Sequence, residues 1–200
     1  MFNTIGRAQG WSDSPLTAEG ERGIHELGIG LRQAGIDFKI ARSSDSGRTI
    51  QTMGIILEEL GLTGKIPYRF DKRIREWCFG SFDGGYDGDL FMGVMPRVFN
   101  IDYVHQLSYA ELAEGLVEVD TAENWEKLSG RIWQGFSEIA EELEAAGGGK
   151  ALVVSHGMTI GTFVYLINRM QPHGLGNGSV TIVDYEDGQF SVVSIGDMSY

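Results

Sequence analysis

The chain has 200 residues, an apolar fraction of 42% and a formal net charge of −12 at pH 7. That length suits a domain with a sizeable core, and the negative charge argues against nucleic acid or an anionic membrane as a partner, because both demand a basic face. A single cysteine, Cys78, allows no intramolecular disulfide, residues 1–10 lack the pattern of a signal peptide, and no stretch has the apolar length of a membrane span, so we expect a cytoplasmic protein.

Hydrophobic spacing predicts that helices and strands alternate in the first third of the chain. Thr17 can cap a helix that extends to residue 34, and residues 38–41 have the composition of a short strand. A second helix follows this strand, and Gly61 ends it. Residues 66–70 are a second strand candidate.

The middle of the chain has weaker patterns. Residues 76–88 are rich in glycine and aromatic side chains and show no clear period. Residues 90–118 predict short helices in an excursion over the sheet, where lids and substrate-selecting loops tend to lie. Residues 120–123, Asp-Thr-Ala-Glu, have the pattern of a capping box and predict a long helix through residue 146.

The last quarter predicts a strand, a helix and a hairpin. Residues 151–154 are typical of a buried strand, residues 158–167 of a buried helix, and residues 180–185 and 190–195 of a hairpin. This alternation predicts a single α/β domain over residues 1–200, a three-layer sandwich with a mostly parallel sheet and helices on both faces. Ligands of such sheets bind at the carboxyl ends of the strands.

His156 lies at a junction between a strand and a helix. It follows residues 151–154 and precedes Gly157. The unpaired amides of the helix's first turn, together with its positive dipole end, predict an anion site beside the imidazole. The alternative is a core histidine that bonds to a backbone carbonyl, but the position at the end of a strand and the following glycine favour a functional role.

Two further charged residues are candidates for the same site. Arg48 falls in the first turn of a helix, where a cation is unfavourable unless an anion bridges it to the amides; the alternative is an ion pair with Asp45 or a solvated side chain. Glu76 has bulky apolar neighbours, and desolvation there would raise its pKa as a general acid requires. Its alternative is an ion pair with Arg73 or Arg75.

The other histidines and the glycine-rich stretches carry no comparable pattern. His25, His105 and His173 are expected to have structural or solvated roles, and no metal-ligand spacing joins any of the histidines. The glycine runs match neither a P-loop nor a dinucleotide-binding fingerprint. We therefore expect no metal and no cofactor.

Five short motifs follow one another along the chain: Asn3…Arg7-Ala8-Gln9-Gly10, Asp13-Ser14-Pro15-Leu16-Thr17, Ser43-Ser44…Arg48…Gln51-Thr52, Arg75-Glu76…Phe79-Gly80 and Ser155-His156-Gly157. In this order they resemble the histidine phosphatase superfamily, also called phosphoglycerate mutase-like. Each motif alone is a weak signal, but all five in the family's order span the chain and are specific.

The resemblance implies transfer of a phosphoryl group from a small phosphomonoester to an enzyme histidine and then to water, without a metal. It implies that Arg48 clamps the phosphate, that Glu76 protonates the leaving group and that His156 is the second histidine of the pocket. Arg7 and Asn3 would complete the pocket wall, and Gly157 would be a further substrate contact.

The chain departs from the family's pattern at its first residues. In the family the first strand ends in Arg-His-Gly a few residues before the position of Asn3, and that histidine is the nucleophile. The chain as given starts after this motif. We therefore expect a sheet without its first strand, a site without its nucleophile and neighbouring strands with unpaired backbone groups.

Together these features predict a phosphomonoester hydrolase of the histidine phosphatase type that acts on a small phosphorylated metabolite through a phosphohistidine. One alternative is a mutase, although the short interval between Glu76 and His156 favours hydrolysis. Others are an inactive remnant that binds phosphate through Arg48 and His156, and a truncated chain that does not fold. The patterns leave the substrate and the oligomeric state open, and the residues that select the substrate are expected within 90–118.

Overall fold

The computed structural model describes residues 2–119 and 121–200. Its elements in chain order are η1 (Phe2–Ile5), α1 (Ala18–Gln33), β1 (Phe38–Ser43), α2 (Gly47–Glu59), β2 (Tyr68–Phe70), η2 (Lys72–Ile74), η3 (Gly80–Phe82), η4 (Gly88–Val94), α3 (Met95–Phe99), η5 (Val104–Gln106), α4 (Tyr109–Val119), α5 (Trp125–Ala145), β3 (Lys150–Val154), α6 (Gly157–Asn168), β4 (Val180–Glu186) and β5 (Gln189–Asp197).

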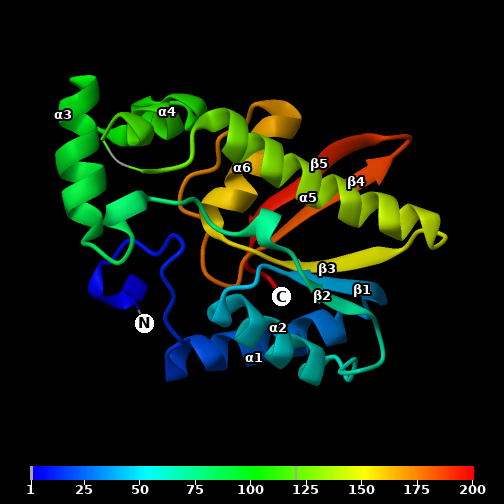
Figure 1. Ribbon diagram of the computed structural model, residues 1–200. Helices are drawn as coiled ribbons and strands as arrows, with labels where there is room; N and C mark the ends of the chain where they lie inside the picture. The colour runs from blue at the N-terminus through cyan, green and yellow to red at the C-terminus, as the bar shows by residue number, and fades with distance from the viewer. Residues whose placement is uncertain (1, 120) are drawn as a thin grey trace.

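The central sheet has parallel strands in the order β2-β1-β3. Helices α1 and α2 cover one face of this sheet, and α5 crosses the other face (Figure 1). Side chains of β3 alternate between the two layers, because Leu152 and Val154 pack with α1 and α2 whereas Ala151 and Val153 pack with α5. The predicted three-layer α/β fold is confirmed.

Strands β4 and β5 form the predicted antiparallel hairpin. Asp187 and Gly188 make its two-residue turn with φ angles of 50° and 77°, and positive φ at both positions is typical of a tight hairpin turn. Within residues 2–119 and 121–200, the hairpin pairs with no other strand and β3 pairs only with β1. The expected open edge of the central sheet is therefore present at β3.

Helix α5 begins later than predicted. The sequence predicted a start at the capping box of residues 120–123, of which Asp120 lies outside the described residues. Instead the Asn124 side chain caps α5 by accepting a hydrogen bond from the Lys127 amide at 3.1 Å. Glu123 does not complete a capping box because its carboxylate binds Arg131. The predicted start is wrong because this ion pair and the Asn124 cap replace the local pattern.

Residues 90–118, the segment predicted as an excursion, contain short helical elements, as predicted. Leu90, Met95 and Leu116 from this segment are fully buried against Leu128 and Ile132 of α5. The excursion lies beyond the carboxyl end of β3, on the side where α6 begins (Figure 1). No helix in the described part of the chain has both the length and the apolar character needed to cross a bilayer.

Candidate active site

Arg48 and His156 meet at the carboxyl edge of the central sheet. Strands β1 and β3 are neighbours and run in parallel, so the helices that follow them begin at the same edge. Arg48 lies in the first turn of α2, and His156 is the N-cap residue of α6. Arg48 Nη2 lies 2.9 Å from His156 Nδ1. The parallel pairing of two strands thus joins candidates that are 108 positions apart in the sequence.

Hydrogen bonds around His156 determine its protonation state. A guanidinium can only donate, so Nδ1 accepts from Arg48 and the ring proton resides on Nε2. Nε2 lies 2.7 Å from Ser44 Oγ, and Ser44 Oγ lies 2.8 Å from Thr49 Oγ1. Burial and the positive charge of Arg48 hold the pKa of His156 well below its ordinary value. His156 is therefore a neutral imidazole whose Nδ1 lone pair faces Arg48.

The loop of residues 9–13 surrounds the Arg48 guanidinium. Nη1 donates to the Ser12 carbonyl at 2.9 Å and pairs with Asp13 at 3.0 Å, and Nη2 donates to the Gly10 carbonyl at 3.0 Å. Asp13 also accepts from the amide of Gly47, which starts α2. A bound anion would compete with Asp13 for the guanidinium, because the loop and the anion would bind the same N–H groups of Arg48.

Glu76 is buried against the start of α6. Its Oε1 accepts hydrogen bonds at 3.0 Å from the amides of Trp77 and Thr159, and its Oε2 accepts from the amide of Met158 at 3.2 Å. Burial raises the pKa of Glu76 above its ordinary value although these bonds and the Arg48 charge oppose the rise. Oε2 has fewer bonds than Oε1 and is the oxygen better placed to carry a proton.

The amides at the start of α6 donate hydrogen bonds to a side chain of the protein itself, the carboxyl group of Glu76. The sequence predicted a phosphate on these amides, beside His156. In the structure, the amides of Met158 and Thr159 donate to the carboxylate of Glu76. The position of Gly157 is open, since a Cβ added there would meet no atom within 4 Å. The assignment of Gly157 to a substrate contact stays a prediction.

The sequence left open an ion pair of Arg48 with Asp45 and of Glu76 with Arg73 or Arg75. None of these pairs is present among the described residues. Asp45 pairs with Arg75 at 2.5 Å, so it is not the partner of Arg48. Arg73 pairs with other acids, and Glu76 forms no ion pair with either arginine. The carboxyl group of Glu76 is thus surrounded by neutral donors.

Arg7 and Asn3 are not brought to Arg48 and His156 by any described contact. Arg7 donates to the Gly84 carbonyl, and its guanidinium lies 4.8 Å from the centre of the Tyr86 ring. Asn3 belongs to η1, and its side chain lies outside the described part of the structure. Their assignment to the pocket wall stays a prediction.

Several residues that hold the site together carried no assigned role in the sequence. Ser44 supports His156, Asp13 binds Arg48 and Thr159 contacts the Glu76 carboxylate. The position of Ser44 directly after a strand was an available signal, because side chains at strand ends gather at the ligand edge. Thr159 had no such signal, since its role depends on a partner 83 positions away.

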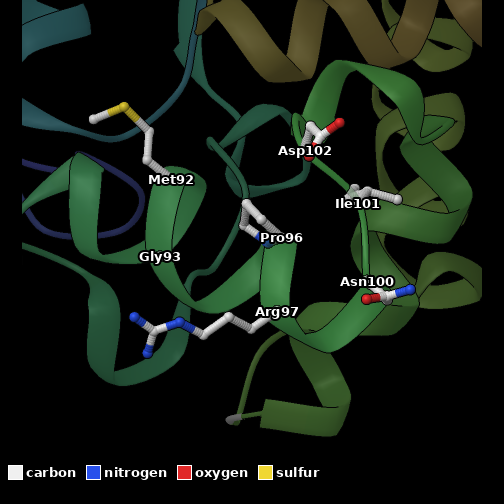
Figure 2. Close-up of a pocket in the computed structure, with 7 residues that line it drawn as sticks. All are labelled: Met92, Gly93, Pro96, Arg97, Asn100, Ile101 and Asp102. Atoms are coloured by element: carbon white, nitrogen blue, oxygen red, sulfur yellow. The ribbon is translucent and has the colours of Figure 1, made fainter.

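Away from Arg48 and His156, one hollow is lined by arginines and acids that pair with one another, such as Arg42 with Glu142 and Arg73 with Asp71. A hollow of about 280 Å³ in the excursion contains one cation, Arg97, whose side chain extends away from Asn100 and Ile101 (Figure 2). Its polar groups do not converge on a point. Within the described residues, no group of three or more histidine, cysteine or acidic side chains is arranged to hold a metal ion.

Comparison with known proteins shows the family of the whole chain. A family model described as histidine phosphatase superfamily (branch 1) matches residues 1–198. A protein of Salmonella arizonae named probable phosphoglycerate mutase GpmB is 31% identical, over 100% of this chain and 89% of the relative. The crystal structure of phosphoglycerate mutase from Bacillus anthracis has a TM-score of 0.94 and 35% identity, covering 100% of this chain and 89% of that one. The alpha-ribazole phosphatase of Shigella flexneri shares the fold, with a TM-score of 0.73 at 18% identity over 99% of this chain and 92% of that one.

Proposed function

The chain belongs to the histidine phosphatase superfamily, branch 1, and from that premise we propose that its site transfers the phosphoryl group of a small phosphomonoester to a histidine and then to water. The observation that carries the proposal is the contact of Arg48 with His156 beside the buried carboxyl group of Glu76. A cation for the phosphate and an acid for the leaving group are two of the three functions that this chemistry requires, and the third is a histidine nucleophile.

Binding begins with displacement of the loop contacts of Arg48. A phosphate offers the guanidinium charge-assisted hydrogen bonds that replace those to Asp13 and to the carbonyls of residues 9–13. His156 Nδ1 is an acceptor and a phosphate oxygen is one too. The two can therefore form a hydrogen bond only when either Nδ1 or the phosphate oxygen carries a proton. The open position of Gly157 gives the phosphate room beside the imidazole.

The proposed reaction has two steps. A histidine nitrogen bonds to phosphorus while the bond from phosphorus to the ester oxygen breaks, and Glu76 donates its proton to the departing alkoxide. The oxygen of a water molecule then bonds to phosphorus while the bond between phosphorus and the histidine nitrogen breaks; Glu76 accepts a proton from this water, the histidine is restored and inorganic phosphate leaves. Among the described residues, His156 is the histidine at the site, whereas His25 lies on α1 and His105 packs against His173. Both nitrogens of His156 are already hydrogen-bonded, so we assign the attack to no residue of the described chain.

The decisive experiment separates binding from turnover. Thermal protection by inorganic phosphate and hydrolysis of p-nitrophenyl phosphate are measured for residues 1–200 and for a version with a strand ending in Arg-His-Gly fused before Met1. Protection in both forms with turnover only in the fused form supports the proposal. Turnover in both forms would assign the attack to His156, and protection without turnover in either form would indicate a phosphate-binding protein. Absence of protection in both forms contradicts the site.

Arg48→Ala should abolish the protection by phosphate, because Arg48 is the cation that contacts His156. Phosphate at about ten times its Kd adds about 1.4 kcal/mol to the free energy of unfolding and raises the Tm of a 200-residue domain by roughly 3–5 °C. Each variant is compared with and without phosphate, so any loss of stability from the substitution cancels. Arg32→Ala, which removes a half-exposed arginine on α1, should keep the full protection. Protection that survives in Arg48→Ala would remove Arg48 from the site.

A second candidate function is a mutase, and the names of two relatives favour it. The proteins at 31% and 35% identity are named as phosphoglycerate mutases. Incubation of the active form with 3-phosphoglycerate distinguishes the two reactions. Formation of 2-phosphoglycerate without release of phosphate would establish a mutase, whereas release of inorganic phosphate would establish a hydrolase.

A further inference from the structure

Arg131, on the inner face of α5, binds the backbone that carries Glu76. Its Nη1 donates at 2.8 Å to the carbonyls of Arg73 and Arg75, and its Nη2 donates at 2.8 Å to the carbonyl of Glu76. Three carbonyls within four consecutive residues therefore turn toward one guanidinium. Residues 73 and 74 end the three-residue helix η2 and residues 75 and 76 follow it, so no strand or long helix holds this segment.

Glu123 completes the surroundings of Arg131. Its two carboxylate oxygens accept from Nε and Nη2 of Arg131, both at 2.7 Å, and both side chains are about 15% exposed. A guanidinium has five N–H donors, and each one now has an acceptor. An ammonium group has three donors and lacks the planar fork, so lysine cannot reproduce this set.

Two other side chains, those of Trp11 and Thr159, also contact residues 75 and 76. Trp11 Nε1 donates to the same Glu76 carbonyl at 2.9 Å. The Thr159 hydroxyl lies 2.7 Å from the Arg75 carbonyl and 3.1 Å from Glu76 Oε1. Arg131 is the member of this set that fixes three carbonyls at once, so it determines where the backbone of residue 76 lies relative to α6.

We propose that Arg131, oriented by Glu123, is a positioning residue that keeps the Glu76 carboxyl group on the amides of α6. The proposal rests on the role of Glu76 as the proton donor of the proposed function. Arg131 does not contact the carboxyl group itself and acts through the backbone of residues 73–76. Without the guanidinium, three backbone carbonyls of this segment lose their shared donor, and we expect the Glu76 carboxyl group to shift on α6 and become more accessible to water.

The test compares Arg131→Lys with the parent chain by measuring the titration of Glu76 directly. The carboxyl carbon of Glu76 is followed by NMR in protein with ¹³C-labelled glutamate, and its signal is identified as the one lost in Glu76→Gln. We expect the titration midpoint in Arg131→Lys to fall by at least about half a pH unit, because a hydrated carboxyl group titrates nearer its ordinary value. A rise of similar size, from loss of the α6 amides, would equally support positioning by Arg131. An unchanged midpoint overturns the proposal.

Arg42→Lys is the matched control. Arg42 is also buried, its guanidinium also binds backbone carbonyls, and it pairs with Glu142 of the same helix α5, but it has no contact with residues 73–76 among the bonds of the described chain. Arg42→Lys should lower the Tm of the protein and leave the titration midpoint of Glu76 unchanged. A midpoint that moves as far in Arg42→Lys as in Arg131→Lys would show general loosening and overturn the proposal.

A milder variant and an independent readout complete the design. Glu123→Gln keeps Arg131 and should move the midpoint in the same direction by a smaller amount, so it replaces Arg131→Lys if the latter does not fold. The titration needs no substrate, so its outcome stands whether or not the chain hydrolyses a phosphomonoester. In a form that turns over, Arg131→Lys should slow alkyl phosphates more than p-nitrophenyl phosphate, and equal losses count against the proposal.

Discussion

His156 makes the stability of the folded chain depend on pH. Its pKa in the folded state lies well below the ordinary value because of burial and the charge of Arg48. Below about pH 6.5 the unfolded chain binds a proton that the folded chain does not bind, so folded stability falls as the pH drops toward the folded pKa. In this range the loss from His156 approaches about 1.4 kcal/mol per pH unit, and it is absent above the unfolded pKa.

Urea unfolding of the parent chain and of His156→Gln at pH 7, 6 and 5 checks this dependence. The parent should lose more free energy of unfolding between pH 7 and pH 5 than the variant loses, because the variant has no proton to bind at this position. His25→Gln is the control, since His25 is 44% exposed and pairs with Glu59 at the surface of α1. Parallel pH curves for the parent and His156→Gln would contradict the neutral, buried imidazole.

The loss of hydrolysis rate in Glu76→Gln should increase with the basicity of the leaving group. In a form of the chain that turns over, Glu76→Gln removes the proton that a poor leaving group needs and should slow an alkyl phosphate by about 10²–10⁴-fold. The loss with p-nitrophenyl phosphate should be far smaller, because nitrophenolate departs without a proton. Steady-state kcat/KM for both esters gives the comparison, and Glu138→Gln, an exposed carboxylate paired with Arg73, is the control. Equal losses for both esters would rule out Glu76 as the acid.

At the scale of elements, β3 should be less protected from hydrogen exchange than the central strand β1. β1 has a neighbour on both edges, whereas β3 pairs with β1 on one edge only among the described residues. Successive amides of a strand point to opposite edges, so alternate amides of β3 lack a strand partner. Hydrogen exchange followed by NMR should show alternate fast and slow amides in β3 and uniformly slow amides in the middle of β1. Uniform protection of β3 would mean that another segment or another copy covers its open edge.

Elements fixed by local contacts could be predicted from the sequence. Thr17 caps α1 by accepting from the amide of Gly20 three positions away, and Gly61 follows α2 with a φ of 66°. The turn of Asp187 and Gly188 likewise depends only on its own two residues. These predictions are confirmed because the residues that decide them are neighbours in the chain.

Elements and site contacts fixed by distant partners could not be predicted in this way. Glu123 has the sequence pattern of a capping box, yet Arg131 takes its carboxylate, and α5 starts later. The amides at the start of α6 have the pattern of a phosphate site, yet Glu76 lies across them from 82 positions away. In both cases a side chain outside the local pattern binds a group that the pattern had assigned to another role. The meeting of Arg48 with His156 was accessible because parallel strands bring their carboxyl ends to one edge.

At the scale of the whole molecule, the net charge of −12 opposes the approach of a phosphate dianion. Nearby acids weaken the positive field of Arg48 at the site. Arg48 is paired with Asp13, and it interacts electrostatically with Asp83. Raising the ionic strength from about 10 mM to 150 mM shortens the Debye length from about 30 Å to 8 Å, which screens the distant acids while the contacts of Arg48 change little.

Phosphate should therefore bind more tightly as salt is added, the reverse of the usual behaviour of an anion site. We expect the Kd for inorganic phosphate to fall by roughly two- to threefold over this range, since only distant repulsion is removed. Calorimetric titrations in sodium chloride and in potassium gluconate separate screening from competition, because only screening is common to both salts. A Kd that rises with ionic strength in both salts would show that the positive field of Arg48 outweighs the surrounding acids, and the charge of the whole chain would then have no influence on binding.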